Sequence, residues 1–349
     1  MRHPIVQEDL AFITDHPLPW ERFYGKTVLI TGANGFLPAY MVETLLYLNE
    51  LRRGNTVKLL CLVRNKSKAQ QRFADYWDRS ELELIVQDVA ERIIWEGAIH
   101  YIIHAASQAS PKYYGVDPAG TLKANILGTY HLLELARIKN VEGILFFSSG
   151  EVYGEVSDTQ FPTKEMDYGY LDPANVRSCY AEGKRVGETM CVSWNHQYKV
   201  PTKIVRPFHT YGPGMNLKDG RVFADFVSDV IHKRDIVLKS HGRAVRAFCY
   251  LADATTGFFT VLLKGENGHA YNISNDKGVT SVRELANIIA SLFPEFNVNV
   301  VQQERLDTTG YIVSKISRNS PSILKASQLG WEPIFSIEAG FHRTIRSFL

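Results

Sequence analysis

A short apolar run that ends in a glycine-containing turn constrains the fold of this chain more than any other feature. Residues 27–30 are β-prone and largely apolar, Gly32 and Gly35 lie in the turn that follows, and residues 41–51 carry apolar side chains at helical spacing. Glycine permits a tight turn and lets backbone N–H groups approach a pyrophosphate, which the start of the next helix stabilises. The pattern predicts a strand, a phosphate-binding turn and a helix, with a purely structural turn as the alternative.

Strand and helix patterns alternate through the first two-thirds of the chain. Continuous apolar runs, typical of strands buried on both faces, occur at residues 57–63, 84–86, 101–103, 144–147 and 202–205, and helical spacing occurs at 121–138 and 180–198. This alternation predicts an α/β fold with a doubly wound parallel sheet, the Rossmann fold.

The pattern changes after the last of these strands. Gly212, Pro213 and Gly214 interrupt the chain, and short elements follow, including a predicted helix at 281–292. We therefore expect an N-terminal extension of unknown role at 1–25 and a dinucleotide-binding domain at 26–206. Residues 207–349 are expected to form mainly a smaller α/β substrate-binding lobe, with segments that can return to the sheet.

Composition excludes several classes of protein. The 349 residues are 45% hydrophobic, which excludes intrinsic disorder, and 39 Lys and Arg against 37 Asp and Glu give a net charge of +2, which argues against a nucleic-acid partner. The four cysteines are scattered, so neither a disulfide framework nor a metal site is expected. No signal-peptide pattern and no membrane-spanning apolar stretch is present, so we expect a cytoplasmic protein without a membrane partner.

The cofactor type depends on charges after the second strand. An acidic residue there usually accepts the ribose 2′-hydroxyl of NAD, whereas arginine suits the 2′-phosphate of NADP. Arg64 clusters with Lys66 and Lys68, which favours NADP, although these can equally be solvated loop charges. Pro38 stands where a third glycine is usual, and a proline is tolerated in the first turn of a helix.

A candidate catalytic set lies in the second half of the predicted sheet domain. Tyr180 and Lys184 are four residues apart in a predicted helix, so they share a face, and a nearby ammonium lowers the pKa of a phenol. Ser148 and Ser149 follow the strand at 144–147 and so lie where doubly wound sheets bind ligands. Glu151 is a candidate base, or else a capping or surface carboxylate.

These motifs together resemble the extended short-chain dehydrogenase/reductase superfamily, in its NAD-dependent nucleotide-sugar epimerase/dehydratase branch, and within it most of all the UDP-glucuronate decarboxylases. The stretches that carry the resemblance, from about residue 26 to the C-terminus, are Thr31-Gly32-Ala33-Asn34-Gly35-Phe36, Ala109-Ser110-Pro111, Glu151-Val152-Tyr153-Gly154, Tyr180-Ala181-Glu182-Gly183-Lys184, Thr210-Tyr211-Gly212-Pro213, Asp219-Gly220-Arg221-Val222 and Gly330-Trp331-Glu332-Pro333.

The resemblance implies a role for each matching position. Tyr180 would be the base that helps to oxidise a sugar C4 hydroxyl to a 4-ketone, and Ser149 would form a hydrogen bond with the C4 oxygen. Lys184 would hold the nicotinamide ribose, and Glu151 would be a further catalytic residue. The implied cofactor-binding residues are Gly32, Asn34, Gly35, Phe36, Leu37, Arg64, Asp88, Val89, Ala105, Ala106, Ser107, Asn125, Ser148, Tyr180 and Lys184. The implied substrate-binding residues are Ser110, Glu151, His209, Arg221 and Arg246, with Arg246 on the diphosphate. The family resemblance favours NAD.

Two departures from the family pattern bear on the reaction. Gly150 stands where 4,6-dehydratases carry an acidic aspartate and decarboxylases a serine, which disfavours dehydration and weakens the case for decarboxylation. His209 stands where relatives usually carry asparagine near the substrate phosphates, and an interior histidine is an equally good interpretation.

Three functions stay open on this basis. The first is internal-redox chemistry on a nucleotide sugar, decarboxylase-like or of the epimerase/dehydratase type. The second is a net NAD(P)-dependent C4 dehydrogenase or 4-ketoreductase, and the third a non-catalytic nucleotide-sugar-binding module. The resemblance also implies a homodimer formed through the helices around 125–137 and 180–198.

Overall fold

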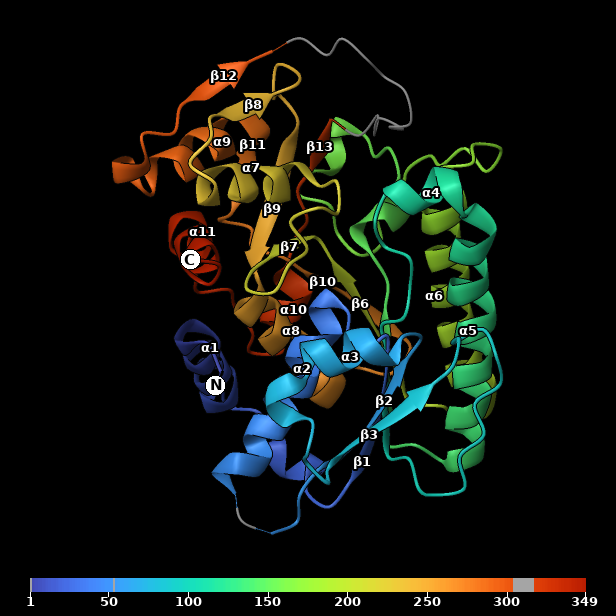
Figure 1. The fold of residues 1–349 in the computed structure, drawn as a ribbon. Helices are drawn as coiled ribbons and strands as arrows, with labels where there is room; N and C mark the ends of the chain where they lie inside the picture. Colours follow the sequence, from blue (N-terminus) through green and yellow to red (C-terminus); the bar gives the residue numbers. More distant parts are fainter. Residues whose placement is uncertain (1, 53, 304–316) are drawn as a thin grey trace.

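A seven-stranded parallel sheet forms the larger part of the molecule (Figure 1). The computed structural model describes residues 2–52, 54–303 and 317–349. The strand order is β3-β2-β1-β4-β5-β6-β10, and every neighbouring pair is parallel. The strands are β1 (Thr27–Thr31), β2 (Lys58–Val63), β3 (Leu82–Val86), β4 (Tyr101–His104), β5 (Gly143–Phe147), β6 (Thr202–Pro207) and β10 (His269–Ile273). The doubly wound sheet predicted from the sequence is confirmed.

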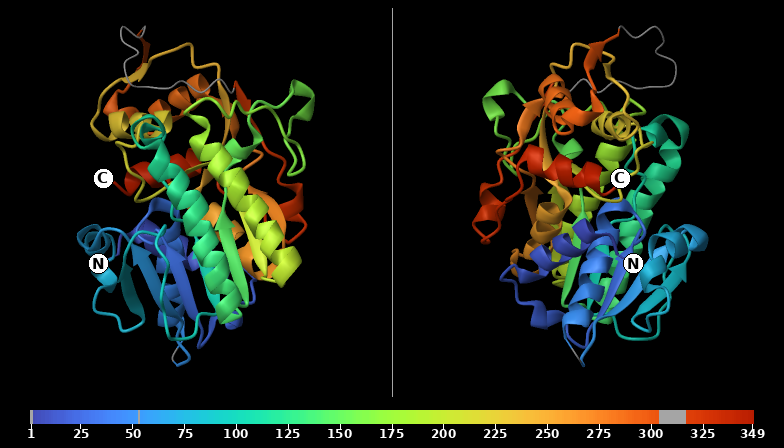
Figure 2. Two further views of the ribbon diagram at one scale, coloured as in Figure 1. Left: turned by 90° about the vertical axis from the view of Figure 1, so that its right-hand side faces the viewer. Right: turned by 60° about the vertical axis from the view of Figure 1, so that its left-hand side comes forward.

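Helices cover both faces of this sheet because its strands are apolar on both sides. In β1, Val28 and Ile30 pack into the cluster on one face, whereas Leu29 packs into the cluster on the other. The first face carries α2 (Phe36–Leu51) and α8 (Leu251–Lys264), and the second carries α5 (Pro118–Lys139) and α6 (Ser178–Tyr198). Figure 2 shows α5 and α6 side by side along the sheet.

A smaller lobe stands at the carboxyl edge of the sheet. Its central strand is β9 (Val245–Tyr250), and the other strands are β7 (His209–Tyr211), β8 (Ile236–Leu238), β11 (Val279–Ser281), β12 (Val300–Gln302) and β13 (Arg318–Asn319). The remaining helices of the molecule are α1 (Pro4–Asp15), α3 (Lys66–Arg72), α4 (Lys112–Val116), α7 (Val222–Ile231), α9 (Val282–Ser291), α10 (Leu324–Ser327) and α11 (Ile337–Arg346). Among the described helices, none is long and apolar enough to cross a bilayer.

Two segments beyond residue 207 belong to the sheet layer. Strand β10 pairs with β6 in parallel, and α8 lies against the sheet with Phe258 edge-on to Phe147, at 4.7 Å between ring centroids. The smaller lobe is therefore discontinuous in sequence, and the chain crosses between the two layers more than once (Figure 1).

The first two dozen residues are part of the core. Trp20 and Phe23 pack edge-on against Phe259 of α8, at 5.1 and 5.9 Å between ring centroids. On α1, the buried Asp9 carboxylate accepts hydrogen bonds from the hydroxyls of Tyr40 (2.8 Å) and Tyr250 (2.7 Å). This segment thereby joins α2 of the sheet domain to β9 of the smaller lobe.

The junction at Asp9 is expected to contribute strongly to stability. Arg343 of α11 also donates to the Asp9 carboxylate, at 2.7 Å, so Asp9→Ala would leave two buried tyrosine hydroxyls without this acceptor and Arg343 without its buried carboxylate partner. We expect this variant to lower the free energy of unfolding by about 3–5 kcal/mol in urea titrations. The matched control is Glu8→Ala, which removes the more exposed carboxylate paired with Arg343 and should cost less than about 1 kcal/mol. Equal losses in the two variants would contradict the assignment.

Candidate active site

The candidate active site lies at the carboxyl edge of the parallel sheet. Strand β1 ends at Thr31 and continues into the glycine turn, β4 ends at His104 and β5 at Phe147, followed directly by Ser148 and Ser149. Since parallel strands have all their carboxyl ends at one edge, the glycine turn and the serines come together although more than 110 residues separate them in the sequence.

The glycine turn packs tightly against the loop after β4. Gly32 has a φ of +64°, and a Cβ atom there would lie 2.9 Å from the Cα of Ala106. The Ala106 N–H donates to the Thr31 hydroxyl at 3.1 Å, which holds the two loops together. A side chain at position 32 is therefore excluded both by the backbone conformation and by the contact.

Polar groups on the loop after β4 and on α5 fit a dinucleotide. The hydroxyl of Ser107 and both polar atoms of the Asn125 amide are buried, and within the described part of the chain none of them has a hydrogen-bond partner. Buried polar groups without partners are costly, so such groups mark a place where a ligand supplies the missing bonds. Ala105, Ala106, Asn34, Phe36 and Leu37, all partly exposed, line the same edge.

The outer end of this edge is more exposed and more charged. Arg64 Nη1 lies 4.0 Å from Asp88 Oδ2, and both side chains are about half exposed, whereas Val89 is buried. The basic residue that favours NADP therefore has a carboxylate as its neighbour. Lys66 and Lys68 lie on α3, on the same side of the sheet domain.

Tyr180 is buried between aromatic and polar neighbours. Its ring is stacked on Tyr114 of α4, at 5.0 Å between centroids and 16° between planes. Burial raises the pKa of Tyr180 to about 12, and the negative charge of Glu151 contributes to this rise. Ser149, through its hydroxyl, and the positive charge of Arg221 act in the opposite direction and lower the pKa. The tyrosine and the serine predicted from the sequence thus lie close enough for Ser149 to lower the pKa of Tyr180.

Lys184 lies one helical turn further along α6, and it is almost completely buried. Its Nζ donates to the Phe147 carbonyl at 2.6 Å and lies 5.8 Å from the centroid of the Tyr180 ring. Burial lowers the pKa of Lys184 to about 7. The groups that lower the pKa of Tyr180 are Ser149 and Arg221, so the effect of Lys184 expected from the sequence does not appear in this arrangement.

The two serines after β5 face different ways. The Ser148 hydroxyl donates to the buried Glu188 carboxylate on α6, and its N–H donates to the Val205 carbonyl at 2.8 Å. The Ser149 hydroxyl oxygen accepts the Glu151 N–H at 3.2 Å and lies near enough to Tyr180 to lower its pKa.

Glu151 has a cationic partner that sequence reasoning missed. Arg177 Nη2 lies 3.6 Å from Glu151 Oε2, and the same guanidinium lies 5.7 Å from the centroid of the Tyr114 ring. Arg177 precedes Tyr180 by three residues, but the irregular segment before α6 shows no periodicity, so its orientation could not be predicted.

The predicted substrate-binding residues border the same region from two sides, Ser110 and Glu151 from loops of the sheet domain and His209, Arg221 and Arg246 from the smaller lobe. Ser110 donates to the Asp219 carbonyl at 2.8 Å, and the Asp219 carboxylate pairs with Arg221, whose guanidinium lies 6.0 Å from the centroid of the Phe36 ring in the glycine turn. The substrate lobe and the cofactor turn therefore meet at Arg221.

His209 lies among rings and cations. Phe223 and Phe248 pack on its imidazole at 6.4 and 5.7 Å between centroids, and Nδ1 is buried without a partner among the described residues. Burial, together with the charges of Arg246 and Arg221, lowers the pKa of His209 to about 3, so the ring is neutral. Arg246 donates to the carbonyls of Val245 and Ser317, at 2.8 and 3.2 Å.

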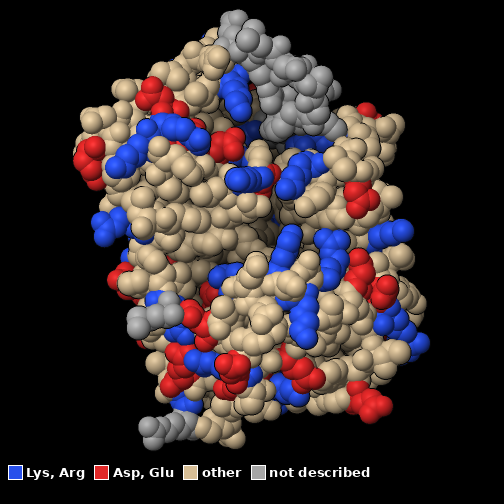
Figure 3. Space-filling view, viewed as in Figure 1, with Lys and Arg blue, Asp and Glu red and all other residues tan. Residues whose placement is uncertain are grey.

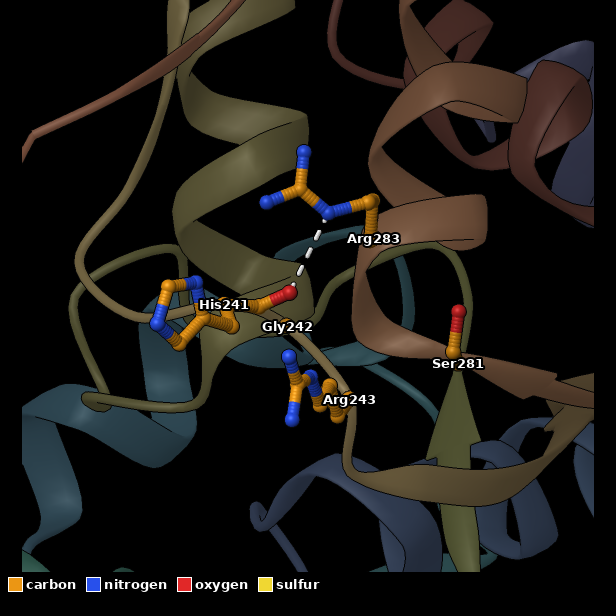
Figure 4. A pocket seen from close by; sticks show the side chains of 5 residues that line it. All are labelled: His241, Gly242, Arg243, Ser281 and Arg283. Carbon is orange, nitrogen blue, oxygen red and sulfur yellow. Dashed lines mark hydrogen bonds between the residues drawn. The ribbon is translucent and has the colours of Figure 1, made fainter.

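The surface around this region is basic and hollowed. Figure 3 shows a hollow across the middle of one face, bordered by several Lys and Arg side chains. Such a rim suits an anionic ligand. A separate open hollow of about 440 Å³ lies in the smaller lobe and contains none of the residues expected to be catalytic (Figure 4); His241, Gly242, Arg243, Ser281 and Arg283 line it. No cluster of His, Cys, Asp and Glu suited to a metal ion occurs in the described ranges.

Fold and site define an enzyme of the short-chain dehydrogenase/reductase type. The sequence model of the NAD dependent epimerase/dehydratase family matches residues 28–274, so the chain belongs to that family. NAD is the cofactor of the family, and the residues at the glycine turn fit it.

Curated relatives with similar sequences are decarboxylases. UDP-glucuronic acid decarboxylase 6 of Arabidopsis thaliana is 32% identical over 93% of this chain and 90% of its own length. UDP-glucuronic acid decarboxylase 1 of Danio rerio is 33% identical over 100% of this chain and 79% of its own length.

Similar solved structures come from other branches of the fold. UDP-glucose 4-epimerase of Thermotoga maritima, solved with UDP-glucose, has a TM-score of 0.78 at 23% identity, covering 92% of this chain and 98% of its own. The dTDP-glucose 4,6-dehydratase of Bacillus anthracis, solved with NAD, has a TM-score of 0.74 at 20% identity, covering 93% and 96%. These likenesses establish the fold.

The buried His104 of β4, close to Lys184, predicts that the stability of the protein depends on pH. His104 is buried between the hydroxyls of Thr31 (2.9 Å) and Thr129 (3.0 Å), and burial, with the charge of Lys184, lowers its pKa to about 3. The unfolded chain therefore takes up a proton at His104 below about pH 6.5 that the folded chain does not, so stability falls as the pH falls, by about 1.4 kcal/mol per pH unit.

A variant without this histidine should lose less stability in acid. Between pH 7.5 and pH 5.0, His104→Gln should lose about 2 kcal/mol less free energy of unfolding than the unmodified protein, measured by urea denaturation at both values. The exposed His196 serves as control, since His196→Gln should keep the full loss. The same loss in all three proteins would show that His104 titrates normally in the fold.

Proposed function

We propose that the chain oxidises the C4 hydroxyl of a nucleotide-linked sugar and that its substrate is UDP-glucuronate, which it decarboxylates. The observation that carries this is the contact of Ser149 with Tyr180 at the carboxyl end of β5, with Lys184 one turn further along α6. The identity of 32–33% with UDP-glucuronic acid decarboxylases over most of the chain supports the choice of substrate.

In this proposal, side chains of the protein bind the C4 hydroxyl and remove its proton. A bound NAD supplies the hydride acceptor, held by residues of the glycine turn, Ser107 and Asn125. Ser149 donates a hydrogen bond to the C4 oxygen, and Tyr180 accepts the proton of the C4 hydroxyl as C4 becomes a ketone. To act as this base the phenol has to be ionised, so the proposal requires that its pKa, about 12 without ligands, falls when cofactor and substrate bind. A uronate with a 4-ketone is a β-keto acid, so it loses CO₂ readily.

A second proton transfer follows the loss of CO₂. C5 then takes up a proton that comes from water, and Glu151, which lies close enough to Tyr180 to influence its pKa, is the side chain proposed to relay it. Arg177 orients this carboxylate at 3.6 Å. Reversal of the first step, with Tyr180 returning its proton to the C4 oxygen, gives a UDP-pentose with no net use of NAD.

The space around Gly150 argues against dehydration. A Cβ atom at this position would lie 2.8 Å from the Phe208 ring, so an acidic side chain there requires the ring to move. Loss of the 6-hydroxyl as water needs a general acid at that place, whereas loss of CO₂ does not. The same contact excludes the serine that decarboxylases carry at this position, so Gly150 counts against 4,6-dehydration without selecting decarboxylation.

Turnover of UDP-glucuronate tests the proposal. The purified protein should release CO₂ and form a UDP-pentose, and Tyr180→Phe should lower kcat by about 10²–10⁴-fold because the base is lost. Binding of UDP-glucuronate, measured by calorimetry, should be retained in Tyr180→Phe, and Tyr170→Phe, at a more exposed tyrosine outside α5 and α6, is the matched control with full activity.

Other outcomes identify the alternatives. A stoichiometric change in nicotinamide absorbance with an NDP-hexose would indicate a net C4 dehydrogenase or ketoreductase. Binding without any turnover, unchanged in Tyr180→Phe, would indicate a non-catalytic module. Mass spectrometry of the dinucleotide released on denaturation decides between NAD and NADP.

We further propose a homodimer formed through α5 and α6 and a cytoplasmic location. Large apolar side chains are exposed along both helices, at Leu127 and Tyr130 on α5 and at Val186, Val192 and Tyr198 on α6. Pairing two copies of this surface would bury these side chains in a four-helix arrangement. The four cysteines are free thiols and all buried, as suits a reducing compartment.

Charge placed on this surface should separate the subunits. Leu127→Asp combined with Val192→Asp should convert a dimer of the 39.5 kDa chain to monomer in light scattering after gel filtration, because burying two carboxylates opposes association. Ile334→Asp, at an exposed position between α10 and α11, should leave the mass unchanged. A monomer before any substitution would refute the proposal.

A further inference from the structure

A buried ion pair joins the candidate catalytic helix α6 to strand β6, and neither of its residues has a role in the proposed reaction. Glu188 of α6 and Arg206 of β6 are joined by two hydrogen bonds, Nε to Oε1 at 2.8 Å and Nη2 to Oε2 at 2.6 Å. The Arg206 side chain is 1% exposed and that of Glu188 11%. Such pairs are expensive to bury, so apolar residues would often serve stability as well or better.

The arginine is held on every side. Its Nη1 donates to the Tyr153 hydroxyl and to the Glu165 carbonyl, both at 2.8 Å, and its Nη2 donates to the Tyr168 hydroxyl at 2.9 Å. A guanidinium bound this completely has a fixed position, and it fixes the carboxylate of Glu188 in turn.

The carboxylate reaches two parts of the candidate active site. Glu188 follows Tyr180 and Lys184 at intervals of four residues, so the three lie on one face of α6. It accepts a hydrogen bond from Ser148, whose neighbour Ser149 contacts Tyr180, while Lys184 binds the carbonyl of Phe147. The end of β5 is thus attached to α6 at two successive residues.

We propose that Glu188 is a positioning residue: with Arg206 and Ser148 it fixes the end of β5 that carries the catalytic serine, and it places a compensating negative charge behind the ammonium of Lys184. This inference rests on the proposed function for its catalytic meaning, but the electrostatic part holds for the protein whatever its substrate.

The groups around Lys184 explain why the Glu188 carboxylate influences its pKa. Its neighbours on α6 are Tyr180, Glu188 and Cys191, and across from it lies His104 of β4, a neutral imidazole. Phe147 of β5 offers a carbonyl, and β6 brings Arg206 behind Glu188. Burial lowers the pKa of Lys184 to about 7, and Glu188 is the first of the charges that oppose this shift.

Because that pKa is close to neutral pH, the protonation of Lys184 responds to small changes in this charge balance. Removing the carboxylate leaves Arg206 as an uncompensated cation nearby and should favour the neutral amine. Removing the guanidinium leaves an uncompensated anion and should favour the ammonium. Removing both should restore the original balance.

The test is a direct titration of Lys184 in the full-length protein. The ¹³Cε resonance of labelled lysine reports protonation, and Lys184→Met identifies the signal. Glu188→Gln should shift the titration midpoint to lower pH by one unit or more, and Arg206→Gln should shift it to higher pH. Glu188→Leu combined with Arg206→Met should return it to within about half a unit of the original value, with the fold kept by apolar packing.

Opposite signs in the two single variants distinguish charge placement from simple loss of structure. The matched control is Glu182→Gln, a partly exposed carboxylate of α6 paired with Arg185, which should leave the midpoint unchanged. Shifts of the same sign in both single variants, or none in either, would overturn the proposal. Should one single variant fail to fold, the sign in the other together with the double variant decides.

A second readout concerns catalysis. In Glu188→Gln the alkaline limb of the pH profile of kcat/KM for UDP-glucuronate should move to lower pH in parallel with the Lys184 titration. A titration shift without turnover in any variant, the unmodified protein included, would reject the proposed substrate and leave the role of Glu188 at Lys184 intact.

Discussion

Parallel pairing of strands is the constraint on which the rest of this molecule depends. Because every strand of the large sheet runs in the same direction, each of them delivers its following loop to the same edge. The glycine turn after β1, the loop after β4 and the serines after β5 meet there without any local sequence signal that links them. The smaller lobe adds Arg221 and His209 from above this edge.

The candidate catalytic helix combines chemistry and burial along one face. Tyr180, Lys184 and Glu188 follow each other by single turns, and all three are withdrawn from solvent. Burial raises the pKa of the tyrosine and lowers that of the lysine, so both groups depend on specific neighbours for their charge. The Ser149 hydroxyl beside Tyr180 and the ion pair of Glu188 and Arg206 beside Lys184 therefore influence the protonation of the two candidate catalytic groups.

Much of the fold was predictable from the sequence. Continuous apolar runs identified six of the strands, because a strand buried on both faces has no polar side to interrupt it. Helices α5 and α6 were predicted close to their observed bounds from apolar spacing. The N-terminal segment was not understood, since its contacts are with α2, α8 and β9, far along the chain.

The candidate site divides in the same way. The glycine turn, Ser149, Tyr180 and Lys184 were predicted from the sequence because their expected chemistry depends on residue type and on spacing within one element. Tyr114, Arg177 and Arg206 were missed because each acts through a partner on another element. The sequence spacing did place Glu188 one helical turn beyond Lys184, on the same face of the helix. This pattern alone does not indicate a buried position, because an acidic residue at helical spacing is usually exposed to solvent.

The sequence by itself therefore determined the class of fold, because strands that alternate with helices form a parallel sheet, and it predicted a cofactor turn and candidate proton-transfer residues from turn composition and side-chain chemistry. Only the tertiary structure decided which charges surround those residues: a carboxylate or guanidinium changes the pKa of a buried group through distance and burial, and both arise from segments that meet only when the chain has folded.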